Sequence, residues 1–184
     1  AQESRGLGDV YKRQDLTSSM RVLADTVGTE DFTARRALVL GAGGVGRAYV
    51  HGLLAHGASV WVTDIDESRA RALARESGAV AVNAQDLQSL QVDIVMNATP
   101  VGMWPNVDET PLDSRLLRPG MVVFDAVYNP QETRLLREAR QAGCRTVSGV
   151  EQFIGQAAEQ FHLWTGRQAP LELMRRVVLE ALSR

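Results

Sequence analysis

The sequence has few of the residues that build disulfides, metal clusters or membrane spans. Its 184 residues include one cysteine and three histidines, His51, His56 and His162, with no metal-ligand spacing, so no disulfide and no metal site are expected. No apolar run approaches the ~18–20 residues of a membrane span, and no secretion signal is visible. The 20 basic and 22 acidic residues nearly balance, which argues against a nucleic-acid or anionic-membrane partner. We therefore expect a cytoplasmic protein that acts on small molecules.

The first fourteen residues differ from the rest of the chain. Residues 1–14 have no periodicity and little to bury, and they resemble the adapter-derived peptides at the ends of translated environmental sequences. We expect a non-native tail there, with a natural disordered tail as the alternative. Residues 15–28 follow with helical periodicity, with Leu16, Met20 and Leu23 on one face.

From residue 37 onward, short apolar runs alternate with helical patterns. We expect strands over 37–41, 58–63, 79–82, 93–96, 121–125 and 144–147. We expect helices over 44–56, 67–76, 86–90, 131–142, 149–164 and 170–182, and a loop rich in Pro and Gly over 99–111. Strands separated by helices of crossover length predict an α/β protein, with a Rossmann-type doubly wound parallel sheet of about six strands and C-terminal helices.

A glycine-rich loop joins the first predicted strand to the helix after it. Gly41-Ala-Gly-Gly-Val-Gly46 matches Gly-x-Gly-x-x-Gly in the context that a dinucleotide requires. Gly41 allows a tight turn, Gly43 lets the backbone approach a pyrophosphate, and Gly46 lets the helix pack closely on the strand. The helix N-terminus favours the phosphates. The cofactor-binding candidates are Gly41, Ala42, Gly43, Gly44, Val45 and Gly46, and the alternative is a glycine turn without a ligand.

An acid at the end of the second predicted strand bears on which dinucleotide binds. Asp64 can accept hydrogen bonds from both adenosine ribose hydroxyls, and it would repel a 2′-phosphate by roughly 1 kcal/mol per charge pair at 4 Å in water. Asp66 adds to the repulsion and Arg69 partly offsets it, although a helix cap and a solvated helix face are alternatives for these two. Ile65, and no arginine, follows Asp64. The sequence favours NAD over NADP.

Three further segments follow predicted strands, and with the glycine loop they carry a resemblance. They are Asn97-Ala-Thr-Pro-Val-Gly-Met103, Val127-Tyr-Asn-Pro130, and Gly149-Val-Glu-Gln-Phe-Ile-Gly-Gln156 with its continuation to Gly166. From about Asp15 to its end, the chain resembles the C-terminal, cofactor-binding half of shikimate dehydrogenase. Phe124-Asp-Ala-Val-Tyr-Asn-Pro and Gln156-Ala-Ala-Glu-Gln-Phe are similar to versions fused to 3-dehydroquinate dehydratase. The resemblance implies an NAD(P)-dependent oxidoreductase that converts shikimate to 3-dehydroshikimate, in the biosynthesis of chorismate and the aromatic amino acids.

The resemblance also assigns roles to residues after the strands. Asn97 and Thr99 would lie along the ribose and nicotinamide half of the cofactor, with a plain irregular connection as the alternative. Ala126 and Gly149 would offer backbone contacts to the cofactor. Tyr128 would contact the substrate, with a buried, backbone-satisfied tyrosine as the alternative. Gln156 would contact a substrate hydroxyl, with a simple helix-face glutamine as the alternative.

The family's proton donor is a Lys–Asp pair located before the glycine loop. Asp15 fits the register of the catalytic Asp, although a helix N-cap is an equal alternative, and Lys12, the only lysine, lies in the unusual tail. We therefore expect residues 15–34 to link the dinucleotide-binding domain, 35–184, to a missing N-terminal substrate domain. A carboxylate without its lysine protonates an alkoxide poorly, so this polypeptide is expected to bind dinucleotide and to turn over shikimate weakly.

Two other functions stay open at this stage. Asp64 slightly favours a quinate/shikimate dehydrogenase, because NAD use is common there. A non-catalytic dinucleotide-sensing module is the alternative from another class, although it would need neither Tyr128 nor Gln156. Self-association, including a homodimer, is left open because the last helix is expected to show an uncovered apolar face formed by Leu171, Met174, Val178 and Leu182.

Side chains away from these motifs are expected to serve packing. Cys144 is expected to be a small core residue, and Trp104 to pack or to cover a loop. Packing in the core or at a domain interface is expected for Phe153, Phe161, Leu163 and Trp164.

Overall fold

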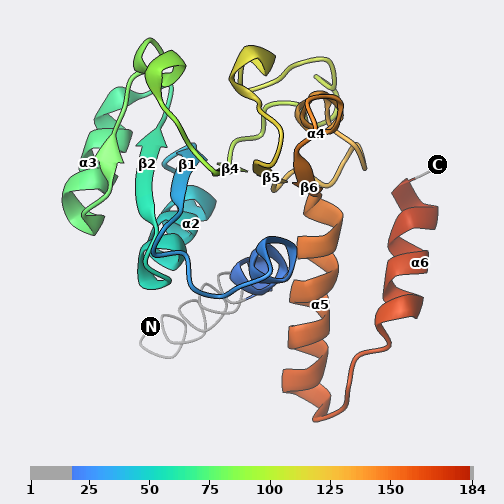
Figure 1. Cartoon of the computed structure of the whole chain (residues 1–184). Helices are drawn as coiled ribbons and strands as arrows, with labels where there is room; N and C mark the ends of the chain where they lie inside the picture. Colours follow the sequence, from blue (N-terminus) through green and yellow to red (C-terminus); the bar gives the residue numbers. More distant parts are fainter. Residues whose placement is uncertain (1–17, 183–184) are drawn as a thin grey trace.

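The computed structural model describes residues 18–182, and its centre is one parallel sheet in the order β3-β2-β1-β4-β5-β6 (Figure 1). The strands are β1 (Arg36–Leu40), β2 (Ser59–Thr63), β3 (Val80–Ala81), β4 (Ile94–Asn97), β5 (Val122–Asp125) and β6 (Arg145–Val147). The helices are α2 (Gly44–Ala55), α3 (Glu67–Ser77), α4 (Arg134–Gln141), α5 (Gly149–Thr165) and α6 (Leu171–Leu182), with 3₁₀ turns η1 (Asp86–Ser89) and η2 (Ser114–Leu116). The strand order reverses between β1 and β4, so the predicted doubly wound Rossmann-type sheet is confirmed.

Both faces of the sheet are buried, as a parallel sheet requires. Along β1, Ala37 and Val39 join a core with α2 and α3, whereas Leu38 and Leu40 join a second core with α4. Alternate residues of β1 therefore face opposite cores, and the continuous apolar runs in the sequence reflect burial on both sides. None of the helices within residues 18–182 is long and apolar enough to cross a bilayer.

The first described helix, residues 18–27, lies on the same face of the sheet as α2 (Figure 1). It buries Met20, Leu23 and Ala24 in the first core. The helix ends at Gly28, whose φ is +89° and whose amide donates to the Ala24 carbonyl at 2.7 Å. The helix predicted over 15–28 is confirmed from residue 18, and the tail over 1–14, Asp15 and Leu16 lie outside the described residues.

Several predicted elements are shorter than expected. The strand predicted over 79–82 is the two-residue β3, and 86–90 forms a 3₁₀ turn in place of a helix. Helix α4 begins at Arg134, three residues later than predicted, because the Thr133 hydroxyl caps it by accepting from the Leu136 amide at 3.3 Å. The differences at β3 and α4 lie at element ends, which sequence periodicity defines least well, whereas residues 86–89 differ in the type of helix.

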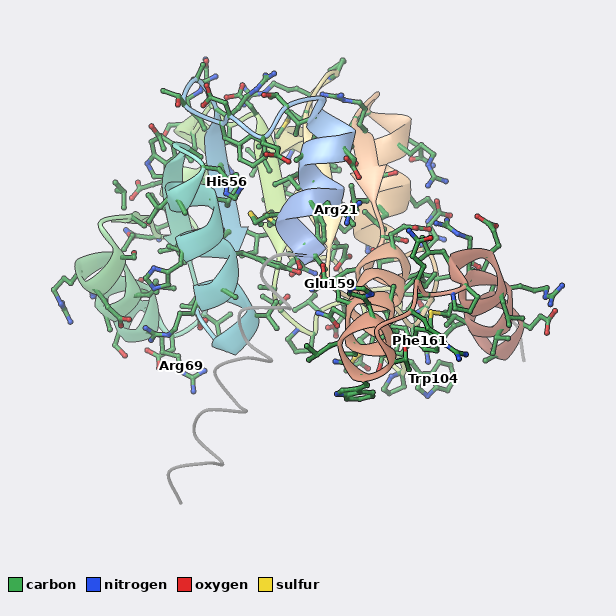
Figure 2. The ribbon with its side chains drawn as sticks, turned by 90° about the horizontal axis from the view of Figure 1, so that it is seen from below. Arg21, His56, Arg69, Trp104, Glu159 and Phe161 are labelled. Atoms are coloured by element: carbon green, nitrogen blue, oxygen red, sulfur yellow. The ribbon has the colours of Figure 1, made fainter. Side chains whose placement is uncertain are left out.

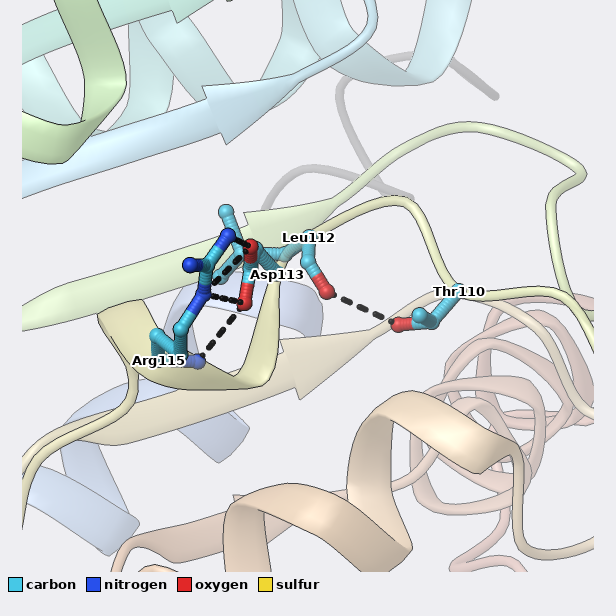
Figure 3. A network of polar contacts seen from close by, with 4 residues as sticks. All are labelled: Thr110, Leu112, Asp113 and Arg115. Carbon is cyan, nitrogen blue, oxygen red and sulfur yellow. Dashed lines mark hydrogen bonds and ion pairs between the residues drawn. The ribbon is translucent and has the colours of Figure 1, made fainter.

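The connection from β4 to β5 is held by its own side chains. In Figure 3 the Thr110 hydroxyl points at the Leu112 carbonyl, 3.3 Å away, and Arg115 folds back on Asp113. Asp113 caps η2 by accepting from the Arg115 amide at 2.9 Å, and hydrogen bonds from the Arg115 guanidinium hold the pKa of Asp113 at about 2. The sequence analysis did not predict η2. This short turn lies between β4 and β5 in the chain.

Helix α6 packs along α5 (Figure 1). The guanidinium of Arg175 in α6 donates to Glu151 of α5 at 2.5 Å. The predicted apolar face of α6 is only partly uncovered: Leu171 is exposed, but Met174, Val178 and Leu182 are half-buried. Three of the α5 residues expected to pack in the core or at a domain interface are exposed, namely Phe153, Leu163 and Trp164, so they are not core residues, and packing at a domain interface stays a prediction for them. Trp104 is also exposed, whereas Cys144 is a buried core residue as predicted.

Candidate dinucleotide site

The glycine loop makes the close contacts that its spacing predicts. Gly41 has φ +98°, and a Cβ there would lie 2.9 Å from Thr99 Cγ2 and 3.2 Å from the Ala98 carbonyl oxygen. A Cβ on Gly46 would lie 1.8 Å from the Gly41 carbonyl oxygen. The tight turn at Gly41 and the close helix–strand packing at Gly46 are therefore confirmed, and the loop lies directly against the segment that follows β4.

The N-terminus of α2 is open to an anion. Gly43 is the N-cap and provides no side-chain hydrogen bond, and the first turn of α2 has no acidic residue. Gly43, Gly44 and Val45 are exposed, and a Cβ on Gly43 would meet nothing within 4 Å. First-turn amides have no partner within a helix, and the helix dipole favours negative charge there. The open space at Gly43 and the exposed first turn of α2 therefore fit a pyrophosphate, and the sequence analysis expected such an approach of the backbone at Gly43.

Asp64 is bonded to the glycine loop through its side chain. Its Oδ2 accepts from the Ala42 amide at 2.7 Å, and its Oδ1 accepts from the Asp66 amide at 2.9 Å. A carboxylate has roughly four lone-pair directions, so about two remain for a ligand. The half-buried Asp64 therefore braces the loop and can still accept from a pair of neighbouring hydroxyls.

The neighbours of Asp64 have local roles. Asp66 caps α3 by accepting from the Ser68 amide at 3.0 Å, and Ile65 is fully exposed. The Nε of Arg69 lies 3.6 Å from Asp66 Oδ2, and Figure 2 shows Arg69 extending outward from α3. The helix-cap and solvated-face alternatives for Asp66 and Arg69 are confirmed, which leaves Asp64 as the acid beside the loop.

Asn97, the last residue of β4, supports the loop that follows this strand through side-chain hydrogen bonds. Its side chain is fully buried; Nδ2 donates to Asp125 at 2.9 Å, and Oδ1 accepts from the amide and hydroxyl of Thr99 at 2.9 and 2.7 Å. The hydrogen bonds of the Asn97 side chain therefore go to Asp125 and Thr99, and the expectation that Asn97 lies along the cofactor stays a prediction. Thr99, half-buried at the sheet edge, is the residue that Asn97 positions.

Asp125, the last residue of β5, is a buried acid that the sequence analysis did not select. Its Oδ1 accepts from Asn97 Nδ2 and from the Val127 amide at 3.0 Å, and its Oδ2 accepts from the Thr133 hydroxyl at 2.6 Å. Burial raises the pKa of Asp125, although these three hydrogen bonds act in the opposite direction. An acid at the end of an apolar strand was the available signal, because a buried carboxylate must be hydrogen-bonded.

Tyr128 contacts α5, the helix that contains Gln156. Tyr128 is 46% exposed and stacks on Phe153 of α5 at a centroid distance of 5.3 Å, so the alternative of a buried tyrosine is wrong. Gln156, half-buried, follows Phe153 by three residues and so lies on the same side of α5. The two predicted substrate residues therefore lie near one another beside Phe153, whose contact with Tyr128 the sequence did not reveal.

The N-terminus of α5 is pressed against the segment after β5. A Cβ on Gly149 would lie 2.4 Å from the Ala126 carbonyl oxygen and 2.5 Å from that of Val127, so only glycine fits. One turn on, Gln152 accepts from the hydroxyl of Tyr49 in α2 at 2.7 Å. This bond joins the helix after the glycine loop to α5.

Two further groups of residues from the sequence analysis are the catalytic candidate Asp15 and the histidines. Asp15 lies outside the described residues. Within residues 18–182 no group of three or more His, Cys, Asp or Glu side chains is arranged to hold a metal ion. His56 packs on Phe32, and its Nδ1 lies 2.9 Å from the Gly52 carbonyl, as expected for a structural histidine.

Asp125→Asn is expected to remove a pH dependence of stability. The pKa of Asp125 in the folded protein lies above 3.8, the usual value that the unfolded chain has. At a pH between the unfolded and the folded pKa, Asp125 is therefore protonated in the native state and ionised in the unfolded chain. The wild-type free energy of unfolding should gain a contribution from Asp125 as the pH falls through the folded pKa toward 3.8. Urea unfolding from about pH 7.5 to about pH 4 measures this gain, which the variant should lack.

Asp93→Asn is the matched control, because the pKa of Asp93 is lowered where that of Asp125 is raised. Burial acts to raise the pKa of Asp93, but the hydrogen bonds and charge of Arg36 outweigh it and lower the pKa. The contribution of Asp93 is therefore lost as the pH falls below its usual value, and the variant should be less sensitive to acid. Parallel curves for the wild type and Asp125→Asn would contradict the prediction for Asp125.

Two family models match the chain. Residues 149–179 match the Shikimate 5′-dehydrogenase C-terminal domain. Residues 36–128 match the family described as NADP oxidoreductase coenzyme F420-dependent. The first match covers all of α5 and most of α6. The second covers the glycine loop, Asp64, the segment after β4 and the start of the segment after β5.

Curated relatives agree with the first match. The chain is 45% identical over 178 residues to the shikimate dehydrogenase (NADP(+)) of Methanosarcina mazei, covering 92% of this chain and 63% of that protein. It is 43% identical over 145 residues to the chloroplastic bifunctional 3-dehydroquinate dehydratase/shikimate dehydrogenase of Arabidopsis thaliana, covering 77% of this chain and 24% of that protein. The chain thus spans less than two thirds of the length of either relative.

Solved structures share the fold over most of the chain. A shikimate dehydrogenase in complex with NADP+ has a TM-score of 0.82 at 31% identity, over 93% of this chain and 62% of that one. The quinate dehydrogenase of Corynebacterium glutamicum in complex with NAD has a TM-score of 0.79 at 34% identity, over 91% and 62% of the two chains.

Proposed function

Because the chain belongs to the shikimate dehydrogenase family, we propose that it forms the nicotinamide-nucleotide half of an oxidoreductase acting on shikimate. The reaction is the interconversion of shikimate and NAD(P)+ with 3-dehydroshikimate and NAD(P)H, a step toward chorismate and the aromatic amino acids, and we place it in the cytoplasm. The observation that carries the proposal is the open N-terminus of α2, adjacent to Asp64, at the point where the strand order reverses.

The order of the strands sets how a dinucleotide would lie. Asp64 ends β2, the glycine loop follows β1, and Thr99 follows β4. The adenosine ribose would bond Asp64, the pyrophosphate would bond the amides of α2, and the nicotinamide half would lie toward Thr99, with the backbone of Ala126 and Gly149 beyond it. When bound, the nicotinamide would accept a hydride from the substrate.

The substrate contacts proposed for the chain are neutral polar groups. The Tyr128 hydroxyl and the Gln156 amide suit the hydroxyls of a polyol acid. The described residues, 18–182, contain no lysine, so a Lys–Asp proton donor would not come from them. Residues 18–182 would therefore bind the cofactor and orient the substrate. A group outside them would accept the proton of the shikimate hydroxyl as the hydride leaves, and would donate it back in the reverse reaction.

Titration calorimetry on the 184-residue chain tests the proposal. NADH and NADPH are expected to bind one to one, and shikimate oxidation is expected to stay near the rate without protein. A folded sample that binds neither nucleotide sinks the proposed function. Full-rate oxidation of shikimate by this chain would instead overturn the assignment of the proton donor to a group outside residues 18–182.

Quinate is a second candidate substrate, which the half-buried Asp64 favours. An acid beside the adenosine ribose disfavours a 2′-phosphate, and the similar quinate dehydrogenase was solved in complex with NAD. We propose a preference for NAD, although the name of the Methanosarcina mazei relative gives NADP(+). Relative rates with shikimate and quinate, in a protein that includes the part the relatives have beyond this chain, would decide between the two acids.

A non-catalytic dinucleotide sensor is disfavoured by the exposed Tyr128 beside α5, which a sensor does not need. A crystal soaked with shikimate in which neither Tyr128 nor Gln156 lies near the ligand would favour the sensor. An attached 3-dehydroquinate dehydratase, as in the Arabidopsis thaliana relative, and a homodimer stay predictions.

A further inference from the structure

Asp125 connects, through one carboxylate, the two segments that follow the carboxyl ends of β4 and β5, which we call the ligand edge of the sheet. Its Oδ1 accepts from Asn97, whose own Oδ1 accepts from both the amide and the hydroxyl of Thr99. The same Oδ1 accepts from the Val127 amide, immediately before Tyr128. Two successive hydrogen bonds, through Asn97, connect this oxygen atom to Thr99. One hydrogen bond connects it to Val127, the residue before Tyr128.

A buried acid is an unusual choice for fold stability alone. Asp125 is fully buried and follows Val122, Val123 and Phe124, which show that apolar residues pack well along β5. Burying a carboxylate is unfavourable unless its hydrogen bonds compensate, and apolar replacements of buried polar groups are often neutral for stability. The hydrogen bonds of Asp125 go to backbone and side chains that shape the ligand edge, so its benefit lies in fixing their positions.

The phosphate-binding part of the site has a separate support. The glycine loop is held by Asp64 at Ala42 and by the close contact of Gly46 with Gly41. The hydrogen bonds of Asp125 go to Asn97, Val127 and Thr133, which lie outside residues 41–46. The glycine loop contacts the segment after β4 at Gly41, but its hydrogen bond and its packing do not pass through Asp125, so loss of Asp125 should disturb mainly the nicotinamide half of the site.

We propose that Asp125 is a positioning residue that sets the segments carrying Thr99 and Tyr128 relative to each other, so that together they receive the nicotinamide half of the cofactor beside the substrate. This inference rests on the proposed function, because it assumes that the nicotinamide half lies at these segments. A second bond joins the segments nearer their tips, where the Trp104 amide donates to the Asn129 carbonyl at 3.0 Å. Asp125 fixes them at their base.

The test compares two ligands on the wild-type chain and on Asp125→Ala. ADP probes only the adenosine and pyrophosphate half, whereas NADH probes both halves. We expect the Kd of ADP to change by less than about twofold in the variant, and that of NADH to rise by about tenfold, equivalent to one or two lost hydrogen bonds. General loosening of the fold would weaken both ligands together.

Two further variants separate positioning from stability. Asp125→Asn keeps an oxygen for Asn97 and Val127, so it should restore most of the NADH affinity. Thr133→Val removes the Oδ2 bond and the cap of α4, so it should lower stability and leave the ratio of NADH to ADP affinity unchanged. If Asp125→Ala does not fold, Asn97→Ala breaks the same connection from its other end and should show the same loss confined to NADH.

The other outcomes of these binding measurements would overturn either the positioning role of Asp125 or the proposed function. Equal weakening of ADP and NADH, an unchanged ratio in a folded Asp125→Ala or Asn97→Ala, or no recovery in Asp125→Asn would overturn the positioning role. A wild-type chain that binds NADH no better than ADP would also overturn it, while leaving dinucleotide binding itself intact. A wild-type chain that binds neither ligand would reject the proposed function.

Discussion

Replacing Gly46 by alanine is expected to lower the free energy of unfolding by about 3 kcal/mol, near the upper end of the usual range for overpacking. The added Cβ would lie 1.8 Å from the Gly41 carbonyl oxygen and 2.7 Å from its carbon, and backbone atoms cannot rotate away as a side chain can. Helix α2 must therefore move off β1, which displaces the amides that would hold the pyrophosphate. Losing two charge-assisted bonds of ~1.5 kcal/mol each would weaken NADH about a hundredfold.

Two other glycines provide matched controls for Gly46→Ala. A Cβ on Gly43 meets nothing within 4 Å and the residue has φ −75°, so Gly43→Ala should fold normally but weaken NADH about tenfold by entering the ligand space. A Cβ on Gly155, in α5, makes an ordinary 3.5 Å contact with Ser18, so Gly155→Ala should keep both properties. Urea unfolding and calorimetry on all three variants check the pattern. Normal stability of Gly46→Ala would show that the close packing is not required.

Asp64→Asn is expected to shift the ratio of NADH to NADPH affinity about a hundredfold toward NADPH. A 2′-phosphate carries about two charges, and each repels a carboxylate at 4 Å by ~1 kcal/mol in water and by ~4 kcal/mol in a partly dry site. Removing the charge should favour NADPH over NADH, because the repulsion of the 2′-phosphate is lost and an amide oxygen accepts ribose hydroxyls less strongly than a carboxylate. Asparagine has one oxygen for the amides of Ala42 and Asp66, and the loss of one of these two contacts should weaken both nucleotides alike. Dissociation constants for both nucleotides at one salt concentration measure the ratio.

Asp66→Asn is the control for Asp64→Asn. Asn caps helices about as well as Asp, and the Asp66 side chain is exposed and occupied with Ser68, so the ratio should change less than about threefold. Tighter binding of NADPH than NADH by the wild type would show that the proposed preference for NAD is wrong.

Most of the fold could be predicted from the sequence because each level of the pattern agreed with the next. The apolar runs that form β1, β4 and β5 are buried on both faces, and such runs have few alternatives to a central parallel strand. The glycine spacing located α2 and its neighbour β2, and hence Asp64. Boundaries were less well defined where a single side chain decides them, as at Thr133.

The polar contacts across the site could not be predicted in the same way. Asn97 and Asp125 are 28 residues apart and meet only because β4 and β5 are neighbours in the sheet. Tyr49 and Gln152 are joined across 103 residues. Sequence spacing reports neighbours within a helix or strand, so it identified Asn97 as polar and at a strand end, but not that its amide turns inward.

The helix over residues 18–27 has a consequence for anyone who would trim this protein to a minimal nucleotide-binding unit. Its Met20, Leu23 and Ala24 complete the same core as Tyr49 and Phe124, although a βαβ description of the sheet would start at β1. A shortened protein beginning at Arg36 would expose that core to water, and we expect such a protein to aggregate. A workable truncation must keep this helix, even though it belongs to none of the sheet's crossovers.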